Sequence, residues 1–134
     1  MIRKANCRCG DCYVEVEGDP DINLVCHCSK CRQRTGSAFG WQVYFQNDRF
    51  LTQVGEFTKY DSVGDSGAVT WWFCGRCAST LFWKVEGILP GYTGVAAGCF
   101  NDEPMGPPAS LSPTDGHPCG WLSELSTLPP LSIP

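Results

Sequence analysis

Short stretches rich in β-branched and aromatic residues recur along the chain, and this pattern predicts strands. In the second stretch large apolar residues stand at alternate positions, so one face of a sheet would carry them into a core. These residues are Phe39, Trp41, Val43 and Phe45. The five predicted strands cover residues 13–16, 39–45, 69–73, 81–85 and 92–97.

The segments between the predicted strands are rich in residues that reverse the chain, because they tolerate positive φ or fix the geometry of a turn. A short helical turn is expected over residues 29–34, with Ser29 as its N-cap and Gly36 as its terminator. The sequence therefore predicts a mainly β fold of short antiparallel strands with little helix. The turn residues are Gly18-Asp19-Pro20, Gly55, the segment 64–67 and Gly87.

The length of 134 residues predicts a single domain, because chains of this size rarely divide. We expect residues 1–105 to form its β core. From Pro104 onward the chain holds eight of its ten prolines, which cannot donate ladder hydrogen bonds. Residues 106–134 are accordingly predicted to form an extension that packs on the same domain, with Trp121 and Leu122 as its anchors.

Charge is distributed unevenly along the chain. The net charge is −4 and the isoelectric point is about 5.0, with every Lys and Arg within residues 1–84. Nucleic acid binding needs a dense basic face, which this balance does not favour. The N-terminus has no apolar stretch of signal-peptide length, and no apolar run is long enough to cross a membrane. We therefore expect a cytoplasmic protein, in a compartment where cysteines serve metal binding or catalysis.

Seven of the ten cysteines form three tight groups, and their spacing is typical of zinc ligands. Cysteines one or two residues apart can reach one ion from a single turn, whereas a disulfide across one intervening residue would be strained. A closed structural zinc site takes four thiolates, and a catalytic site takes three protein ligands with one open position. The groups are Cys7 and Cys9, then Cys26, Cys28 and Cys31, and finally Cys74 and Cys77.

The division of seven into four and three predicts two zinc ions per chain. The two pairs, Cys7 and Cys9 with Cys74 and Cys77, would form the closed structural site, and the three-cysteine group would form the open catalytic one. Two alternatives compete with this interpretation. One is a disulfide-bonded exported domain, and the other is a thioredoxin-type redox pair at Cys74 and Cys77, which belongs in a βαβ context.

Other residues near these groups have candidate roles of their own. His27, between two predicted ligands, is a candidate acid or base, although such a residue more often points away. Basic residues stand beside the ligands and would offset the charge of the thiolates. The alternative is that they are ordinary solvated surface charges. They are Arg8, Arg76, Lys30, Arg32 and Arg34. The remaining cysteines, Cys12, Cys99 and Cys119, are predicted to be small buried hydrophobes.

Three segments of the chain resemble the glutathione-dependent formaldehyde-activating enzymes and their centromere-protein-V-like relatives. They are CRCGDCYVEVEGDP, VCHCSKCRQRTGSAFG and FCGRCASTLFW, and the resemblance covers residues 5 to 105. It implies a β-tent fold, with a structural zinc at the two cysteine pairs and a catalytic zinc at Cys26, Cys28 and Cys31. The end of the chain departs from the family, because PASLSPTDGHPCGWLSELSTLP displaces His117 and replaces a Pro-Trp pair by Cys119-Gly120-Trp121.

The resemblance implies a carbon–sulfur lyase-type enzyme that joins glutathione to formaldehyde. Glutathione carries two carboxylates, for which Lys30, Arg32 and Arg34 are the predicted anchors. His27 or a bound water would supply the proton for the alkoxide. The alternative function is a non-catalytic zinc module that binds a thiol or a protein partner.

Overall fold

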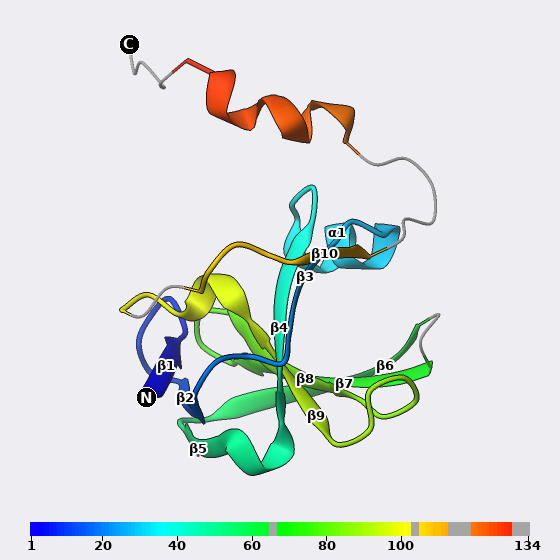
Figure 1. Cartoon of the computed structure of the whole chain (residues 1–134). Helices are drawn as coiled ribbons and strands as arrows, with labels where there is room; N and C mark the ends of the chain where they lie inside the picture. Colours follow the sequence, from blue (N-terminus) through cyan, green and yellow to red (C-terminus); the bar gives the residue numbers. More distant parts are fainter. Residues whose placement is uncertain (65–66, 103–104, 113–118, 130–134) are drawn as a thin grey trace.

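The computed structural model describes residues 1–64, 67–102, 105–112 and 119–129, with the side chains of 123–126 left aside. Two sheets make up most of it (Figure 1). The small sheet has the strand order β1 (Ile2–Asn6), β2 (Tyr13–Glu17) and β5 (Phe50–Val54). The large sheet has the order β10 (Ser110–Ser112), β3 (Ile22–Cys26), β4 (Gly40–Gln46), β9 (Tyr92–Ala96), β8 (Thr80–Val85), β7 (Gly67–Cys74) and β6 (Phe57–Gly64).

Helical structure is short among the described residues. The α-helix α1 covers Ser29–Thr35, and three 3-10 helices cover Asn47–Arg49 (η1), Ala97–Cys99 (η2) and Gly120–Thr127 (η3). The strands pair antiparallel except for β10, which runs parallel to β3. The prediction of a mainly β fold of short antiparallel strands is confirmed. No helix of the described chain has the length and apolarity that crossing a membrane requires.

All five predicted strands are present, in β2, β4, β7, β8 and β9, but five further strands had no strong signal in the sequence. In the edge strand β6, most side chains are exposed, so the strand lacks the apolar alternation that would reveal it. The predicted helical turn ends at Gly36 in a left-handed conformation, as expected. Its N-cap is Cys28 rather than Ser29, and Phe39 precedes β4 rather than belonging to it.

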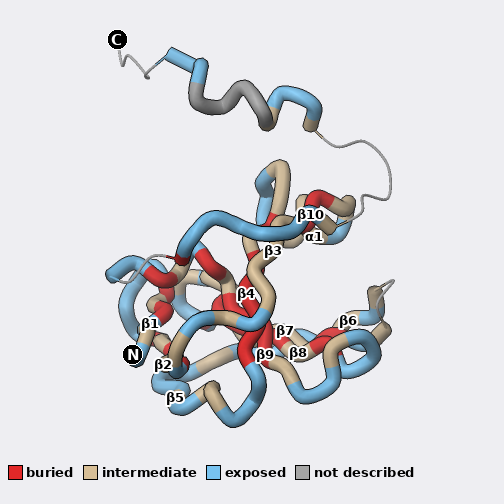
Figure 2. Tube along the Cα trace, in the orientation of Figure 1, coloured by how far each residue is buried: buried red, intermediate tan, exposed pale blue. Residues whose placement is uncertain are grey.

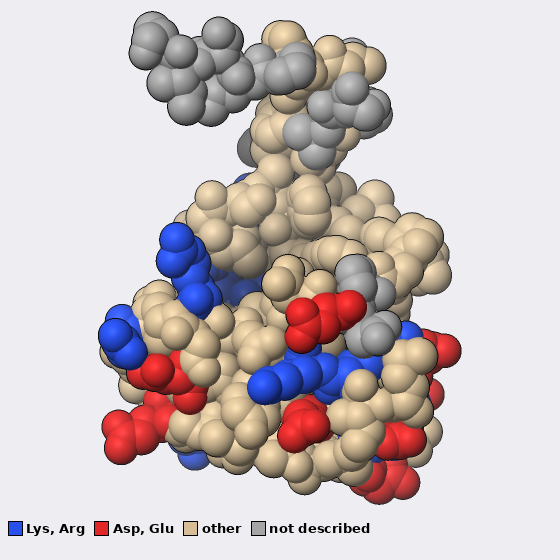
Figure 3. Space-filling view, turned by 90° about the vertical axis from the view of Figure 1, so that its left-hand side faces the viewer, with Lys and Arg blue, Asp and Glu red and all other residues tan. Residues whose placement is uncertain are grey.

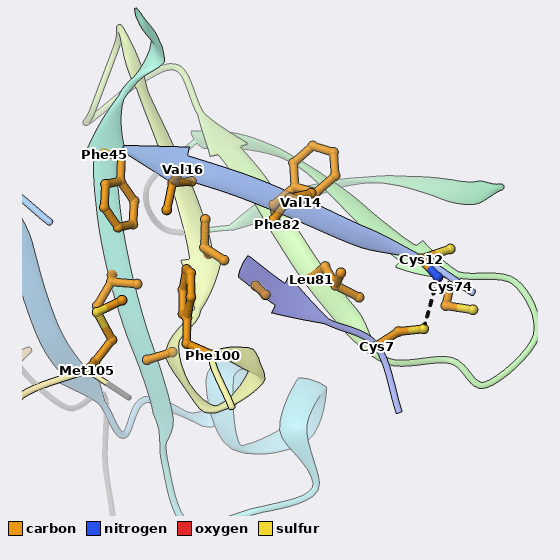
Figure 4. Packing of buried hydrophobic residues seen from close by; sticks show 14 residues of the cluster. Cys7, Cys12, Val14, Val16, Phe45, Cys74, Leu81, Phe82, Phe100 and Met105 are labelled. Carbon is orange, nitrogen blue, oxygen red and sulfur yellow. Dashed lines mark hydrogen bonds between the residues drawn. The ribbon is translucent and has the colours of Figure 1, made fainter. Parts of the chain in front are cut away.

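The main core lies where the two sheets meet. Side chains of β2, including Val14 and Val16, converge with Phe45 and Phe82 of the large sheet (Figure 4). A second cluster, containing Tyr44 and Trp83, covers the other face of the large sheet. Strand β4 is therefore buried on both faces, and the predicted single apolar face describes only half of its packing. The buried stretches run along β4 and β9 in Figure 2.

The C-terminal segment begins in the core and then follows the sheet edge. Met105 is buried, and the Asn23 side chain donates to the carbonyls of Gly106 and Pro107 at 3.0 and 3.2 Å. Strand β10 then pairs with β3, and η3 is drawn apart from both sheets (Figure 1), with Trp121 51% exposed. The packing of 106–134 as a whole on the domain stays a prediction, and His117 lies outside the described residues.

Charged side chains of both signs are interleaved on the face that Figure 3 presents. Several of the bases in the molecule form ion pairs: Arg3 with Asp19 at 2.5 Å, Arg76 with Asp11 at 2.9 Å, and Arg49 with Asp21. The Arg76–Asp11 pair is exposed, and pairs of this kind contribute about 0–1 kcal/mol each to stability. They fix local loop positions, and the candidate chemistry lies elsewhere, at the cysteines.

Candidate metal centres

The two cysteine pairs converge from distant parts of the sequence, with Cys74 lying 65 positions after Cys9. Cys7 and Cys9 lie in the turn after β1, whereas Cys74 ends β7 and Cys77 lies in the turn to β8. Their four Sγ atoms all lie within 4.8 Å of one another, with 3.6 Å between Cys7 and Cys9 and 3.7 Å between Cys9 and Cys74. Sulfurs bound tetrahedrally at about 2.3 Å from zinc are about 3.8 Å apart, so the four-cysteine cluster fits that ion.

Each turn is closed by backbone hydrogen bonds that aim the sulfurs at one point. Gly10 N donates to the Cys7 carbonyl at 3.2 Å, and Ala78 N donates to the Cys74 carbonyl at 2.8 Å. Gly10 and Ala78 both have positive φ, at 86° and 66°, which a tight turn of this kind requires. A residue with positive φ directly after the second cysteine therefore recurs in both halves of the cluster, although the hydrogen bond spans three residues in one turn and four in the other.

Donors around the four-cysteine cluster stabilise thiolate sulfur. The backbone N of Cys12 donates to the Cys7 Sγ at 3.2 Å, as drawn in Figure 4. The Ser79 hydroxyl lies 3.3 Å from the Cys77 Sγ, and chiefly this hydrogen bond lowers the pKa of Cys77 to about 5. Backbone N–H groups, first that of Cys77, also lower the pKa of Cys74. Two of the four thiols, Cys74 and Cys77, are thus shifted toward the ionised form that binds a cation, whereas burial and the neighbouring thiols raise the pKa of Cys9 to about 12.

The three-cysteine group occupies the corner between β3 and α1. Cys26 is the last residue of β3, Cys28 is the helix cap, and Cys31 lies in the first turn. Their Sγ atoms also lie within 4.8 Å of one another, and those of Cys26 and Cys28 are 3.5 Å apart. The spacing again fits tetrahedral zinc, and a set of three thiolates leaves one of four positions for another ligand.

Hydrogen bonds within the three-cysteine group shift the pKa values of Cys26 and Cys31 in opposite directions. Contact with the Cys31 thiol is the main cause that lowers the pKa of Cys26 to about 5, and the same contact, with burial, raises the pKa of Cys31. The Gln42 side-chain amide donates to the Cys31 Sγ at 3.3 Å. Sequence reasoning missed Gln42, although a polar residue inside the apolar stretch 39–45 was a signal that could have identified it.

The predicted basic residues of this region lie on α1 in different settings. The Arg32 guanidinium donates to the His27 carbonyl at 2.6 Å, while Lys30 is exposed. The Arg34 guanidinium lies over the rings of Trp71 and Trp83, at 4.7 and 4.9 Å from their centroids. Burial lowers the pKa of Arg34, and the neighbouring Cys31 thiol acts in the opposite direction. Arg34 is therefore the deepest of the three bases and the one beside the sulfurs.

The remaining predicted residues surround these clusters. His27 is buried between Cys26 and Cys28, with 8% of its surface exposed. Cys12 is buried beside the four-cysteine cluster, and burial is the main cause that raises its pKa to about 12. Cys99 and Cys119 are half-buried. A hollow of about 690 Å³ lies beside α1, lined by Arg32, Gly36, Ser37, Ala38, Phe39, Cys119, Trp121 and Leu122.

Fold and site together define a mainly β protein with two cysteine clusters of metal-binding geometry. The family model of the glutathione-dependent formaldehyde-activating enzymes matches residues 2–115, and the chain belongs to this family. A crystal structure of a Rhodobacter sphaeroides protein is similar in fold, with a TM-score of 0.59 and 23% sequence identity over 75% of this chain and 89% of that one. A search of the curated proteins gives no match.

Proposed function

We propose that this protein is a zinc-dependent carbon–sulfur lyase-type enzyme that joins glutathione to formaldehyde and gives S-hydroxymethylglutathione. Membership of the family supports the reaction. One observation supports the location of the active site: three thiols converge at the corner between β3 and α1, and a hollow lies beside the same helix. In this proposal Cys26, Cys28 and Cys31 hold the catalytic zinc. Cys7, Cys9, Cys74 and Cys77 hold a structural one.

The proposed reaction adds a thiol to an aldehyde. The C–S bond forms as the carbonyl π bond breaks and its electron pair moves to the oxygen. The oxygen gains a proton, which balances the proton lost from sulfur. Zinc, when bound, supplies a positive charge that keeps an incoming thiol ionised near neutral pH. His27 lies between two of the cysteines and is the proposed proton donor, directly or through a water. A reducing compartment such as the cytoplasm suits a site built of thiols.

The first test is the rate of exchange between formaldehyde and glutathione, because the uncatalysed addition already proceeds. Exchange spectroscopy by NMR, at fixed pH and reactant concentrations, would compare wild-type protein, Cys28→Ser and no protein. We expect acceleration by the wild type only. A wild type that holds two zinc ions yet leaves the exchange rate unchanged would favour the second candidate, a non-catalytic zinc module that binds a thiol or a protein partner.

The proposed carboxylate anchors are Lys30, Arg32 and Arg34. Replacing Lys30 and Arg32 together by Ala is expected to weaken glutathione binding about tenfold or more, since a hydrogen bond to a charged group is worth about 1.5–3 kcal/mol. Calorimetric titration with glutathione, beside the zinc content of each sample, would measure this. Arg76→Ala is the matched control, because Arg76 belongs to the four-cysteine region and pairs with Asp11. Unchanged affinity in the double variant would remove the anchor role.

A further inference from the structure

Three residues on neighbouring strands of the large sheet form a row behind the three-cysteine group. Tyr44 of β4 and Trp83 of β8 are both paired in register with Gly94 of β9, which lies between them. A Cβ on Gly94 would lie 2.2 Å from the Trp83 Nε1, so only glycine leaves room for the indole there. The indole crosses Gly94 and its Nε1 donates to the Tyr44 hydroxyl at 3.0 Å, with the two rings at 81°.

The row continues through Gln42 to a sulfur of the cluster. The Tyr44 hydroxyl donates to the Gln42 Oε1 at 3.0 Å, and the Gln42 Nε2 donates to the Cys31 Sγ at 3.3 Å. Trp83, Tyr44 and Gln42 are 1%, 5% and 5% exposed. Buried polar groups are costly unless they are paired, and in this row the amide of Gln42 is paired with a group of the candidate metal centre.

The direction of this chain is fixed by its first member. An indole N–H can only donate, so the Tyr44 oxygen accepts this hydrogen bond and directs its own O–H toward Gln42. The Gln42 oxygen is thereby occupied as an acceptor, and its NH₂ group must face Cys31. An amide that could otherwise present either end to the sulfur is held with its donor end forward.

We infer that Gln42 is a positioning residue of the three-cysteine centre, oriented by Tyr44 and Trp83 so that its amide donates to the Cys31 sulfur. The donated hydrogen bond fixes the direction of this sulfur and draws electron density from it. The inference rests on the proposed role of the cluster as a metal centre. In the four-cysteine cluster the sulfurs are contacted by the Cys12 backbone N–H and the Ser79 hydroxyl instead, so this cluster serves as an internal reference.

The test uses the full chain loaded with Co²⁺, whose thiolate charge-transfer absorption reports on the sulfurs. The variants are Gln42→Leu, which removes the donor, and Tyr44→Phe, which removes only the hydroxyl that orients it. Gln53→Leu and Tyr60→Phe make the same chemical changes at exposed positions of β5 and β6. Competition with a chelator measures the affinity of each ion, and circular dichroism checks the fold.

We expect Gln42→Leu to weaken one of two Co²⁺ ions by about 10–100-fold and to move part of the charge-transfer absorption to lower energy, since partners of metal ligands typically contribute on this scale. Tyr44→Phe should shift both readouts in the same direction by less, and it decides the question if Gln42→Leu does not fold. The second ion and both control variants should be unchanged. Two ions with unaltered affinity and spectrum in both variants would overturn the inference and leave the proposed function standing. A wild type that binds a single ion, unaffected by Cys28→Ser, would overturn both.

Discussion

Replacing Cys74 by Ser is expected to abolish cooperative unfolding, whereas Cys28→Ser should leave the fold intact. Cys74 is 1% exposed and belongs to the cluster that joins the turn after β1 to the turn between β7 and β8. Structural zinc contributes about 10–16 kcal/mol in small zinc domains, while a whole domain is stable by only about 5–15 kcal/mol. Loss of the ion from this cluster would therefore remove as much free energy as the whole fold is stable by, and we expect replacement of the buried ligand Cys74 to cause that loss.

The measurement is the zinc content per chain together with thermal unfolding followed by circular dichroism. Cys28→Ser should lower the content from about two ions to one and keep a sharp transition, because Cys28 lies at the corner of β3 and α1 and not between the sheets. Cys119→Ser, at a cysteine outside both clusters, is the matched control. Loss of all structure in Cys28→Ser would mean that the three-cysteine centre is structural as well.

Replacing Gly94 by Ala is expected to cost about 3 kcal/mol of unfolding free energy, at the upper end of overpacking effects. The added methyl group would meet the Trp83 indole at 2.2, 2.6 and 2.8 Å. The indole is buried and packs against Trp71, tilted at 45°, and Tyr44, edge-on at 81°. The Trp83 indole cannot move aside without disturbing the second hydrophobic cluster, to which it belongs.

Denaturant unfolding of Gly94→Ala beside Gly98→Ala would measure this effect. A Cβ at Gly98 meets nothing within 4 Å, so this control should change stability by less than about 0.5 kcal/mol. Equal stability of the two variants would contradict the close approach of Trp83 to β9. It would also remove the geometric basis for the orientation of Tyr44.

Local spacing in the sequence was sufficient to group the cysteines, because ligands one or two residues apart must share a turn. Cys26, Cys28 and Cys31 lie on one corner for this reason, and the meeting of Cys7 with Cys74 was expected because a closed zinc site takes four thiolates. The strands with apolar alternation were likewise predictable, since their side chains are selected by burial.

Features that depend on long-range register could not be predicted in this way. The contact of Gln42 with Cys31 requires α1 to return against β4, and the approach of Trp83 to Tyr44 requires β9 to lie between their strands. Single-strand periodicity also predicts one buried face for residues 39–45, although Tyr44 and Gln42 are buried on the other. Strand β10 is three residues long and mostly exposed, so composition alone had placed it in an extended tail.

The parallel pairing of β10 with β3 affects whether the large sheet can pair with the sheet of another copy of this protein. Ser112 lies opposite Cys26 in this pairing, so the short strand covers the backbone that leads directly to the three cysteines. Without it, β3 would become the border of the sheet, with unpaired N–H and C=O groups that can template pairing between chains. The short strand β10 thus covers the sheet edge that leads to the three cysteines and keeps the backbone of β3 from pairing with another chain.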